Sequence, residues 1–357
     1  MRVGILRAVV AIAASVWLAL DVSAQRGAPP PSPYPVTQGK VTRFEKVAEG
    51  VYYATGAGGG NSPVIIGDRD VLIVDTNTTP ANTRAFLEDL KLITNKPVRY
   101  AVNSHYHYDH SDGNQVYREM GVDVVAHEFV KYAMANYDIL HREPYMTSQV
   151  VNGQRRIDTA KMQLAQETDP QKRPALAAQL TAAEKNWADL QEIKVTPPNV
   201  TYKDKKIIDL GGREVQLLFL GRGHTNGDTF VYLPKEKIVC TGDMLESGPA
   251  YMGDGHFDEW IAALENMKKL DFELVLPGHG VPFKDGKTMA TVQQGYLREI
   301  VKQVTELRKQ GVLAVEAAQK VDLSAFKANF PSTARPGAEL RSVRHIYEWL
   351  YEQENKK

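Results

Sequence analysis

Apolar runs of strand length recur through most of the chain, and Gly, Pro, Asn or Asp residues bound them. Such runs predict buried β-strands. The expected strands are residues 51–55, 63–67, 71–74, 98–102, 122–126, 206–209, 214–220, 229–233, 238–241 and 274–276. Residues 83–93 and 259–270 instead repeat apolar positions at the spacing of one helix face. Strands interleaved with amphipathic helices predict a core built from layers of sheet and helix.

The pattern changes between the strands expected at 122–126 and 206–209. Residues 128–196 are rich in Ala, Gln and Lys, show helical periodicity, and contain methionines that suit an adaptable apolar surface. They predict a helical insertion that interrupts the core. Two roles are open to it: simple packing, or a cover over a site formed by the residues on either side. We expect the cover, which would shape substrate preference.

The last part of the chain, residues 288–357, is expected to be a helical extension of the domain formed by residues 42–287. Its clearest element is at residues 339–352, where Val343, Ile346 and Leu350 fall on one helix face. A helix with one apolar stripe buries that stripe against the body of a domain.

The first residues predict a secretory signal peptide. Arg2 and Arg7 precede the apolar run of residues 8–20, and the small residues before Gln25 form a cleavage site. The run is shorter than the roughly 20 residues that a membrane-spanning helix needs. Residues 1–24 would therefore be removed, residues 25–41 would be a proline-rich extended tether, and folding would begin near Thr42. The mature protein is expected to be periplasmic or secreted, without stable membrane insertion.

Cleavage after Ala24 is directly testable. N-terminal sequencing of protein made in a Gram-negative host should begin at Gln25, because the small residues at 22–24 suit signal peptidase. Recovery of the full-length chain from the membrane fraction would contradict this prediction.

Charge and cysteine content narrow the classes of partner. The chain has 43 basic and 43 acidic residues, so its net charge of +0 gives no reason to expect nucleic acid or an anionic membrane as a partner. The expected partner is a small-molecule substrate. Cys240 is the single cysteine, which excludes an internal disulfide, and we expect it to be a buried core thiol.

The densest chemistry follows the strand expected at 98–102. His105, His107, Asp109 and His110 fall within six positions of one another. In extended backbone, side chains two positions apart point the same way, so His105 and His107 can hold one ion together. Asp109 and His110 are placed to reach a second ion. Imidazole and carboxylate ligands suit zinc, manganese or iron better than calcium.

Three further potential ligands also follow short apolar runs. His224, Asp243 and His279 each stand just past an expected strand, with glycine nearby. Ligands at the exits of core strands are where folds of strands and helices place their chemistry. We therefore expect these three side chains to meet the histidine cluster.

The motifs H-x-H-x-D-H, G-x-G-H-T, T-G-D and P-G-H-G occur in this order. With them the chain resembles the metallo-β-lactamase superfamily of binuclear hydrolases, from about residue 51 to 280. The resemblance implies an α+β fold, the αββα sandwich, in which two sheets pack face to face between helices. It also implies two zinc ions, with iron or manganese as alternatives. The implied first-metal ligands are His105, His107 and His224, the second-metal ligands are Asp109, His110 and His279, and Asp243 bridges both.

The resemblance also implies roles beyond the ligands. Asp109 and Asp243 would be catalytic, and Asp75 would support a ligand histidine, since acids behind a metal site orient imidazoles. A bridging aspartate resembles the thioesterase and lactonase branches, including glyoxalase II. The function implied is an exported zinc-dependent hydrolase that uses a metal-bridging hydroxide on an ester, lactone, thioester or β-lactam. A mononuclear iron sulfur dioxygenase of the same fold and a non-catalytic binding protein are the alternatives.

Overall fold

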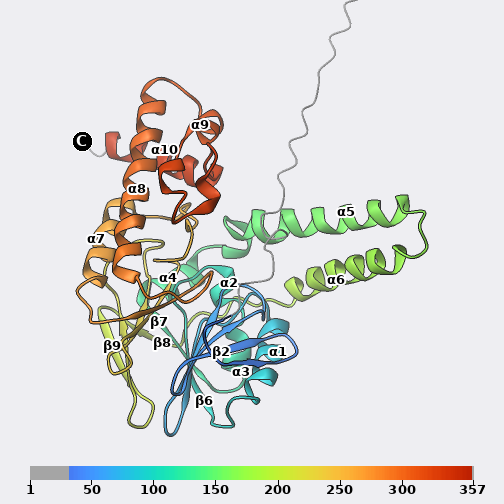
Figure 1. The fold of residues 1–357 in the computed structure, drawn as a ribbon, viewed down its shortest axis with the longest axis vertical. Coiled ribbons are helices and arrows are strands. Elements are labelled where there is room, and N and C mark those ends of the chain that lie inside the picture. The colour runs from blue at the N-terminus through green and yellow to red at the C-terminus, as the bar shows by residue number, and fades with distance from the viewer. Residues whose placement is uncertain (1–31, 356–357) are drawn as a thin grey trace, which may run out of the picture. The chain divides into compact units, whose positions relative to one another are not determined.

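The computed structural model describes residues 32–355 (Figure 1). The predicted signal peptide lies outside these residues. Within residues 32–355, thirteen strands form two sheets, and neighbours in each sheet are hydrogen-bonded. The first sheet has the order β1 (Val36–Gln38), β2 (Arg43–Ala48), β3 (Val51–Thr55), β4 (Ser62–Ile66), β5 (Val71–Val74), β6 (Val98–Val102), β7 (Asp123–His127), β8 (Val200–Tyr202). The second has the order β13 (Leu274–Pro277), β12 (Ile238–Gly242), β11 (Phe230–Leu233), β10 (Glu214–Leu218), β9 (Lys205–Asp209).

The two sheets bury a shared apolar layer between them. Alternate residues of the first sheet, among them Val51 and Tyr53 in β3, pack against alternate residues of the second, among them Leu217 in β10 and Cys240 in β12. All four side chains are buried. Because side chains on a strand alternate between faces, each sheet keeps a second apolar face for helices.

Helices cover both outer faces. On the first sheet lie α1 (Pro80–Leu90) and α3 (Asn114–Glu119), which bury Phe86 and Tyr117. On the second lie α7 (Phe257–Met267) and α8 (Gly286–Lys309), with Trp260 of α7 fully buried. This is the αββα sandwich of the expected α+β fold.

The C-terminal helices pack onto the second sheet's helical layer. After α8 come α9 (Ala314–Lys320) and α10 (Leu340–Asn355). Val343 and Ile346 of α10 are fully buried in the same cluster as Trp260, and the Trp349 and Phe257 rings lie 5.6 Å apart. The stripe expected from the sequence is therefore the docking face.

Three strands were not expected from the sequence: β1, β2 and β8. The folded chain begins before Thr42, because β1 pairs with β2 and the Asp89 carboxylate accepts backbone N–H bonds from Lys40, Val41 and Thr42. The boundary of the expected tether at residue 41 is thus wrong. Each of the two strands β1 and β8 is three residues long and pairs with one neighbour, so neither shows a clear apolar alternation.

The insertion begins with α4 (Glu128–Asn136), η1 (Ile139–His141) and η2 (Met146–Val151). It continues as α5 (Asn152–Gln166) and α6 (Arg173–Gln191), which pack against each other and extend away from the sheets (Figure 1). We call α5 and α6 the helical arm. Leu190 and Trp187, at the end of α6, pack in one cluster with Tyr108. The cover expected for the insertion stays a prediction.

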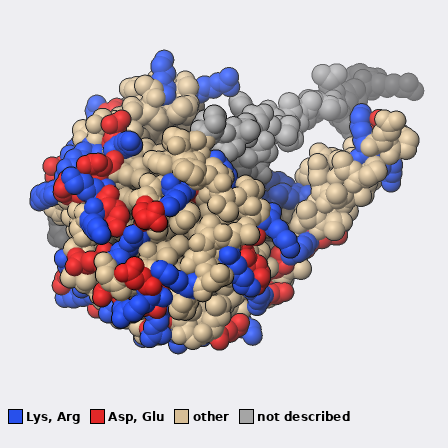
Figure 2. All heavy atoms as spheres, turned by 60° about the horizontal axis from the view of Figure 1, so that its bottom comes forward, with Lys and Arg blue, Asp and Glu red and all other residues tan. Residues whose placement is uncertain are grey.

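No helix within residues 32–355 has both the length and the apolar character needed to cross a bilayer. On the face that Figure 2 draws, basic and acidic side chains are interspersed among other residues.

Candidate metal centre

Strand direction brings the candidate ligands to one edge of the sandwich. Strands β5 and β6 are parallel neighbours in the first sheet, and β12 and β13 are parallel neighbours in the second. Strand β10 runs in the same sense as β12, since both are antiparallel to β11. The segments that follow these strands therefore meet at the same edge.

Three imidazoles converge at the first position. The His107 Nδ1 and His224 Nε2 atoms lie 3.0 Å apart. The ring centroids of His105, His107 and His224 are 4.6 to 4.8 Å from one another, and the rings are nearly perpendicular, at 82° to 89°. Perpendicular rings with nitrogens at one point leave room for a single small ion among them.

A mixed set of imidazole and carboxylate forms the second position. Asp109 and His110 lie on the short helix α2 (Tyr108–Ser111), and His279 follows β13. The His279 Nε2 atom is 3.1 Å from Asp109 Oδ2 and 3.3 Å from His110 Nε2. The three ligand atoms thus face one another from two elements.

Asp243 lies between the two positions. It follows Gly242, the last residue of β12, whose φ of 49° turns the chain out of the strand. Asp243 Oδ2 is 3.9 Å from His105 Nε2, 3.6 Å from His224 Nε2 and 3.5 Å from His279 Nε2. Its Oδ1 is 3.3 Å from His110 Nε2. The structure therefore brings together all seven ligands expected from the motifs.

Asp75 supports this arrangement from behind. It follows β5 with a φ of 63°, and its carboxylate accepts the Ser104 backbone N–H at 2.7 Å and the Ser104 hydroxyl at 2.9 Å. It also lies 2.7 Å from His110 Nδ1. Nδ1 thus carries the proton and Nε2 faces the cluster.

Two glycines allow the backbone to approach the ligands closely. A Cβ atom on Gly60 would lie 2.4 Å from the His110 ring, and a Cβ on Gly278 would lie 2.2 Å from Asp243 Oδ1. No larger residue fits at either position without moving a candidate ligand.

Sequence reasoning missed two acidic residues near the cluster. Asp254 Oδ2 lies 3.0 Å from His107 Nε2, and its Oδ1 accepts a hydrogen bond from Arg142 at 3.0 Å. Glu246 is buried, and its carboxylate lies among the possible ligand atoms beside Asp243 and His279. Neither acid belongs to a recognised motif, and only the fold of the loop after Asp243 places them.

Burial and charge divide the histidines into two groups in the metal-free protein. Burial, together with the neighbouring imidazole of His107, lowers the pKa of His224 to about 3, and the pKa of His105 is also lowered. At His110 and His279 burial opposes the charge, but nearby carboxylates outweigh it and raise both pKa values, that of His279 to about 10. His105 and His224 are therefore neutral at pH 7, whereas His110 and His279 carry protons.

The residues fit divalent metal ions. Two ligand atoms that each lie about 2.1 Å from one ion are separated by roughly 3 to 4 Å, which is the spacing found here. His105 Nε2 and Asp243 Oδ1 are buried without a hydrogen-bond partner, although buried polar atoms ordinarily have one. A mixture of imidazole and carboxylate suits zinc, iron or manganese.

Cys240 and the remaining histidines lie outside the cluster. Cys240 is buried between the sheets, as expected for a core thiol. His127 accepts the Phe129 backbone N–H at 3.2 Å, His141 pairs with Asp138, and His345 bonds the Gly255 carbonyl. His256 precedes α7, and burial and Arg222 lower its pKa to about 4.

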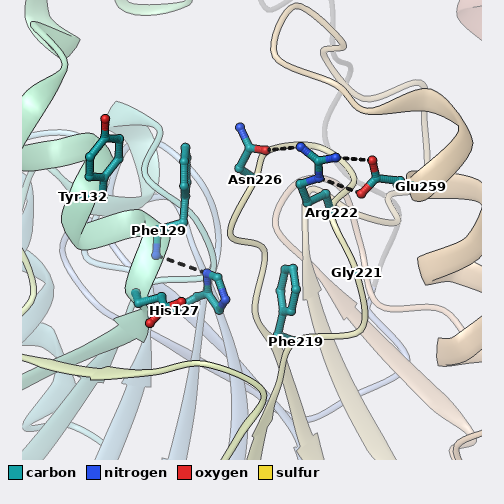
Figure 3. A pocket seen from close by; sticks show the side chains of 9 residues that line it. His127, Phe129, Tyr132, Phe219, Gly221, Arg222, Asn226 and Glu259 are labelled. Carbon is teal, nitrogen blue, oxygen red and sulfur yellow. Dashed lines mark hydrogen bonds and ion pairs between the residues drawn. The ribbon is translucent and has the colours of Figure 1, made fainter.

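A separate cavity of about 660 Å³ lies beside the loop that carries His224. Figure 3 shows the His127 and Phe219 rings stacked on one side and Arg222 held between Asn226 and Glu259 on the other. None of the seven candidate ligands lines this cavity.

The comparison with protein families identifies the class. The model of the metallo-beta-lactamase superfamily matches residues 55–279, which is more than half of the chain and includes all seven candidate ligands. The chain belongs to the metallo-beta-lactamase superfamily. Members of this superfamily typically bind metal ions, and most are hydrolases.

The curated relatives are distant. The chain is 22% identical over 296 residues to a linear primary-alkylsulfatase from Pseudomonas sp. (strain ATCC 19151), covering 78% of this chain and 53% of the relative. It is 23% identical over 218 residues to the 2,4-dinitroanisole O-demethylase subunit alpha of Nocardioides sp. (strain JS1661), covering 60% and 51%. It therefore spans about half the length of these relatives. A metallo-beta-lactamase type 2 from Bacillus sp. (strain 170) is 33% identical over 79 residues, covering 20% and 31%.

A solved structure shares the fold. The metallo-beta-lactamase DIM-1, in a crystal exposed to ceftazidime, is 18% identical with a TM-score of 0.51, covering 73% of this chain and 99% of that chain. At this identity the likeness concerns the fold alone.

Proposed function

We propose that this protein is an exported binuclear metal-dependent hydrolase that acts on a carbonyl substrate, an ester, lactone, thioester or β-lactam, with zinc as its metal. The observation that carries the proposal is the place of Asp243. Its carboxylate lies 3.3 to 3.9 Å from imidazole nitrogens of both ligand sets. A carboxylate in this place can offset the repulsion between two cations and fix their separation.

The residues present would hold the ions in two unequal environments. His105, His107 and His224 would hold the first ion, Asp109, His110 and His279 the second, and Asp243 both. Two such ions supply a hydroxide nucleophile at neutral pH and polarise the scissile carbonyl. A nucleophilic serine or cysteine is then unnecessary, and Cys240 is too deeply buried to serve as one.

The protein also fixes the orientation of its ligands and closes the site on one side. Asp75 and Asp254 contact the far nitrogens of His110 and His107, so His110 Nε2 and His107 Nδ1 are the nitrogens that face the cluster. The Tyr251 ring lies 5.8 Å from the His107 ring, and the Arg341 guanidinium lies over the Tyr251 ring, 4.8 Å from its centroid. His279 remains about one-third exposed, which provides access for substrate.

Metal analysis joined to a hydrolysis panel tests the proposal. The purified chain should contain two zinc ions and hydrolyse at least one of a β-lactam, a lactone and a thioester, and chelation should abolish the activity. A phosphate ester is the negative control. A chain that binds two ions but hydrolyses none of the carbonyl substrates would overturn the substrate class and leave the metal centre intact.

Sulfate ester hydrolysis is a second candidate function. The similarity to the alkylsulfatase extends over 78% of this chain, further than the match to the metallo-beta-lactamase type 2. A medium-chain alkyl sulfate therefore belongs in the panel. Turnover of that ester without turnover of any carbonyl substrate would favour this function over the first.

Metal binding should release protons unequally from the two sets. His224 is already neutral at pH 7, whereas His279, with its pKa of about 10, must lose a proton before it can bind an ion. The affinity for the second ion should therefore rise by about tenfold per pH unit and per proton released, up to about pH 10. Calorimetric titration of metal-free protein, in buffers of different ionisation enthalpy, measures this release. Equal proton release by both ions would contradict the assignment.

Metal binding should depend more on the base of the insertion, residues 128–151, than on the helical arm. Arg142, at the base, holds Asp254 and through it His107. Lys161 and Glu184 form an ion pair across the arm, so a short turn can replace residues 162–183. This trimmed chain should keep its metal content, with kcat/KM changed by no more than about twofold, as for other surface changes. Arg142→Ala should lower first-ion affinity. Loss of metal from the trimmed chain would contradict the prediction that the helical arm does not contribute to metal binding.

A further inference from the structure

We propose that Glu246 is an additional ligand of the second metal ion, beyond the seven residues that the motifs supply. This inference rests on the proposed two-metal centre. Glu246 lies three residues after Asp243, in the loop that leaves β12. Its carboxylate, Asp243 and His279 each offer a ligand atom, and these atoms all lie within 4.8 Å of one another.

The surroundings of Glu246 favour a cation over any other partner. The side chain is 8% exposed, and none of the ion pairs within residues 32–355 joins it to a lysine or an arginine. Its charged neighbours are the Asp243 carboxylate, with which it shares a hydrogen bond, and the His279 imidazole. A buried carboxylate without a cation is strongly unfavourable. Asp243 is buried as well, and its Oδ1 atom has no hydrogen-bond partner, so two buried carboxylates lie at one place without a lysine or an arginine.

Glu246 makes the two metal positions chemically different. The first is surrounded by three imidazoles and shares the Asp243 carboxylate. The second has the imidazoles of His110 and His279, the Asp109 carboxylate, the same shared carboxylate, and Glu246. Carboxylate oxygens suit harder ions with higher coordination numbers, such as manganese, whereas imidazole suits zinc. The second position should therefore accept Mn²⁺ more readily than the first.

The test compares metal binding by the metal-free full-length chain and by Glu246→Gln. Equilibrium dialysis against Zn²⁺ alone and against Mn²⁺ alone, with metal analysis of the retentate, gives the number of ions and their affinities. The Mn²⁺ hyperfine pattern in electron paramagnetic resonance reports the ligand environment without any turnover. In Glu246→Gln the first ion should bind as in the wild type. The affinity for the second should fall by about 100-fold, at the upper end of what the loss of a supporting group costs, with a larger loss for Mn²⁺.

Two further variants keep the result interpretable. Glu246→Asp retains a carboxylate on a shorter side chain, so its second-ion affinity should lie between those of the wild type and Glu246→Gln. Glu88→Gln makes the same chemical change in an exposed ion pair with Lys91 and should bind both ions normally. Glutamine can still hydrogen-bond to Asp243, so a purely positioning role for Glu246 predicts wild-type binding in Glu246→Gln.

The experiment distinguishes failure of the Glu246 inference from failure of the two-metal centre. Wild-type affinities for both ions in Glu246→Gln would overturn the ligand role of Glu246 and leave the two-metal centre standing. A wild-type chain that binds a single ion would overturn the two-metal centre together with this inference. A selective loss of the second ion, graded from Asp to Gln, is the result we expect.

Discussion

Replacing Asp243 by Ala should remove most of the second metal ion and lower the rate of hydrolysis by more than about 100-fold, the upper range for loss of a mere supporting residue. The Asp243 carboxylate is the group that faces imidazoles of both sets, at 3.3 Å from His110 and 3.6 Å from His224. Without it, two cations would face each other without the shared negative charge. The second ion should suffer more, because three imidazoles remain for the first.

Cys240→Ser is the matched control for that experiment. Cys240 lies three residues before Asp243, but its side chain is buried between the sheets. A hydroxyl in that apolar layer should cost about 1–3 kcal/mol of unfolding free energy and leave metal content unchanged. Metal content per chain and hydrolysis rate should be measured for both variants. If Cys240→Ser loses metal while Asp243→Ala keeps it, the assignment of the ligands is inverted.

Of the substitutions proposed here, Asp75→Ala should lower the free energy of unfolding the most. The Asp75 carboxylate accepts the backbone N–H and hydroxyl of Ser104 and lies 2.7 Å from His110 Nδ1, and all three residues are buried. Removing one partner of a buried charged network costs about 3–5 kcal/mol. The φ of 63° at this position adds strain for alanine, which tolerates that conformation poorly. Second-ion affinity should also fall by about 10–100-fold, because His110 loses its orientation.

Asp75→Asn separates the two effects. Asparagine tolerates a positive φ and still accepts the Ser104 N–H, so most of the stability should return. Its amide cannot replace the negative charge behind His110, so the metal defect should remain in part. Urea unfolding and zinc content give both quantities. Equal unfolding free energies for Asp75→Ala and the wild type would contradict the structural role of Asp75.

Local pattern was sufficient for much of this fold. The runs at Val51–Thr55 and Val71–Val74 are apolar enough to identify buried strands, and the stripe on α10 identified its docking face. The candidate ligands could also be predicted, since the spacing of His105 and His107 and the positions of Asp243 and His279 after strands are properties of short segments. The expectation that Cys240 is a buried core thiol is confirmed by its place between the two sheets.

Other features depended on partners far along the chain. Strands β1 and β8 form because β2 and β7 each have an unpaired edge to which they hydrogen-bond. A strand of three residues is too short to show an alternating pattern of apolar residues, so neither could be predicted from its own sequence. The helical arm is helical by composition, but its direction depends on how its base packs.

Asp254 and Glu246, the two acids beside the candidate ligands, show most clearly the difference between what the local sequence predicts and what tertiary contacts decide. In the sequence, Asp254 and Glu246 are single polar residues in a loop without a repeating pattern. They acquire a role only when that loop folds back over His107 and His279 and removes their carboxylates from water. The sequence by itself determined which seven residues are the candidate metal ligands. The tertiary structure decided which further charges are buried beside them, because burial is set by contacts between segments that are distant in the chain.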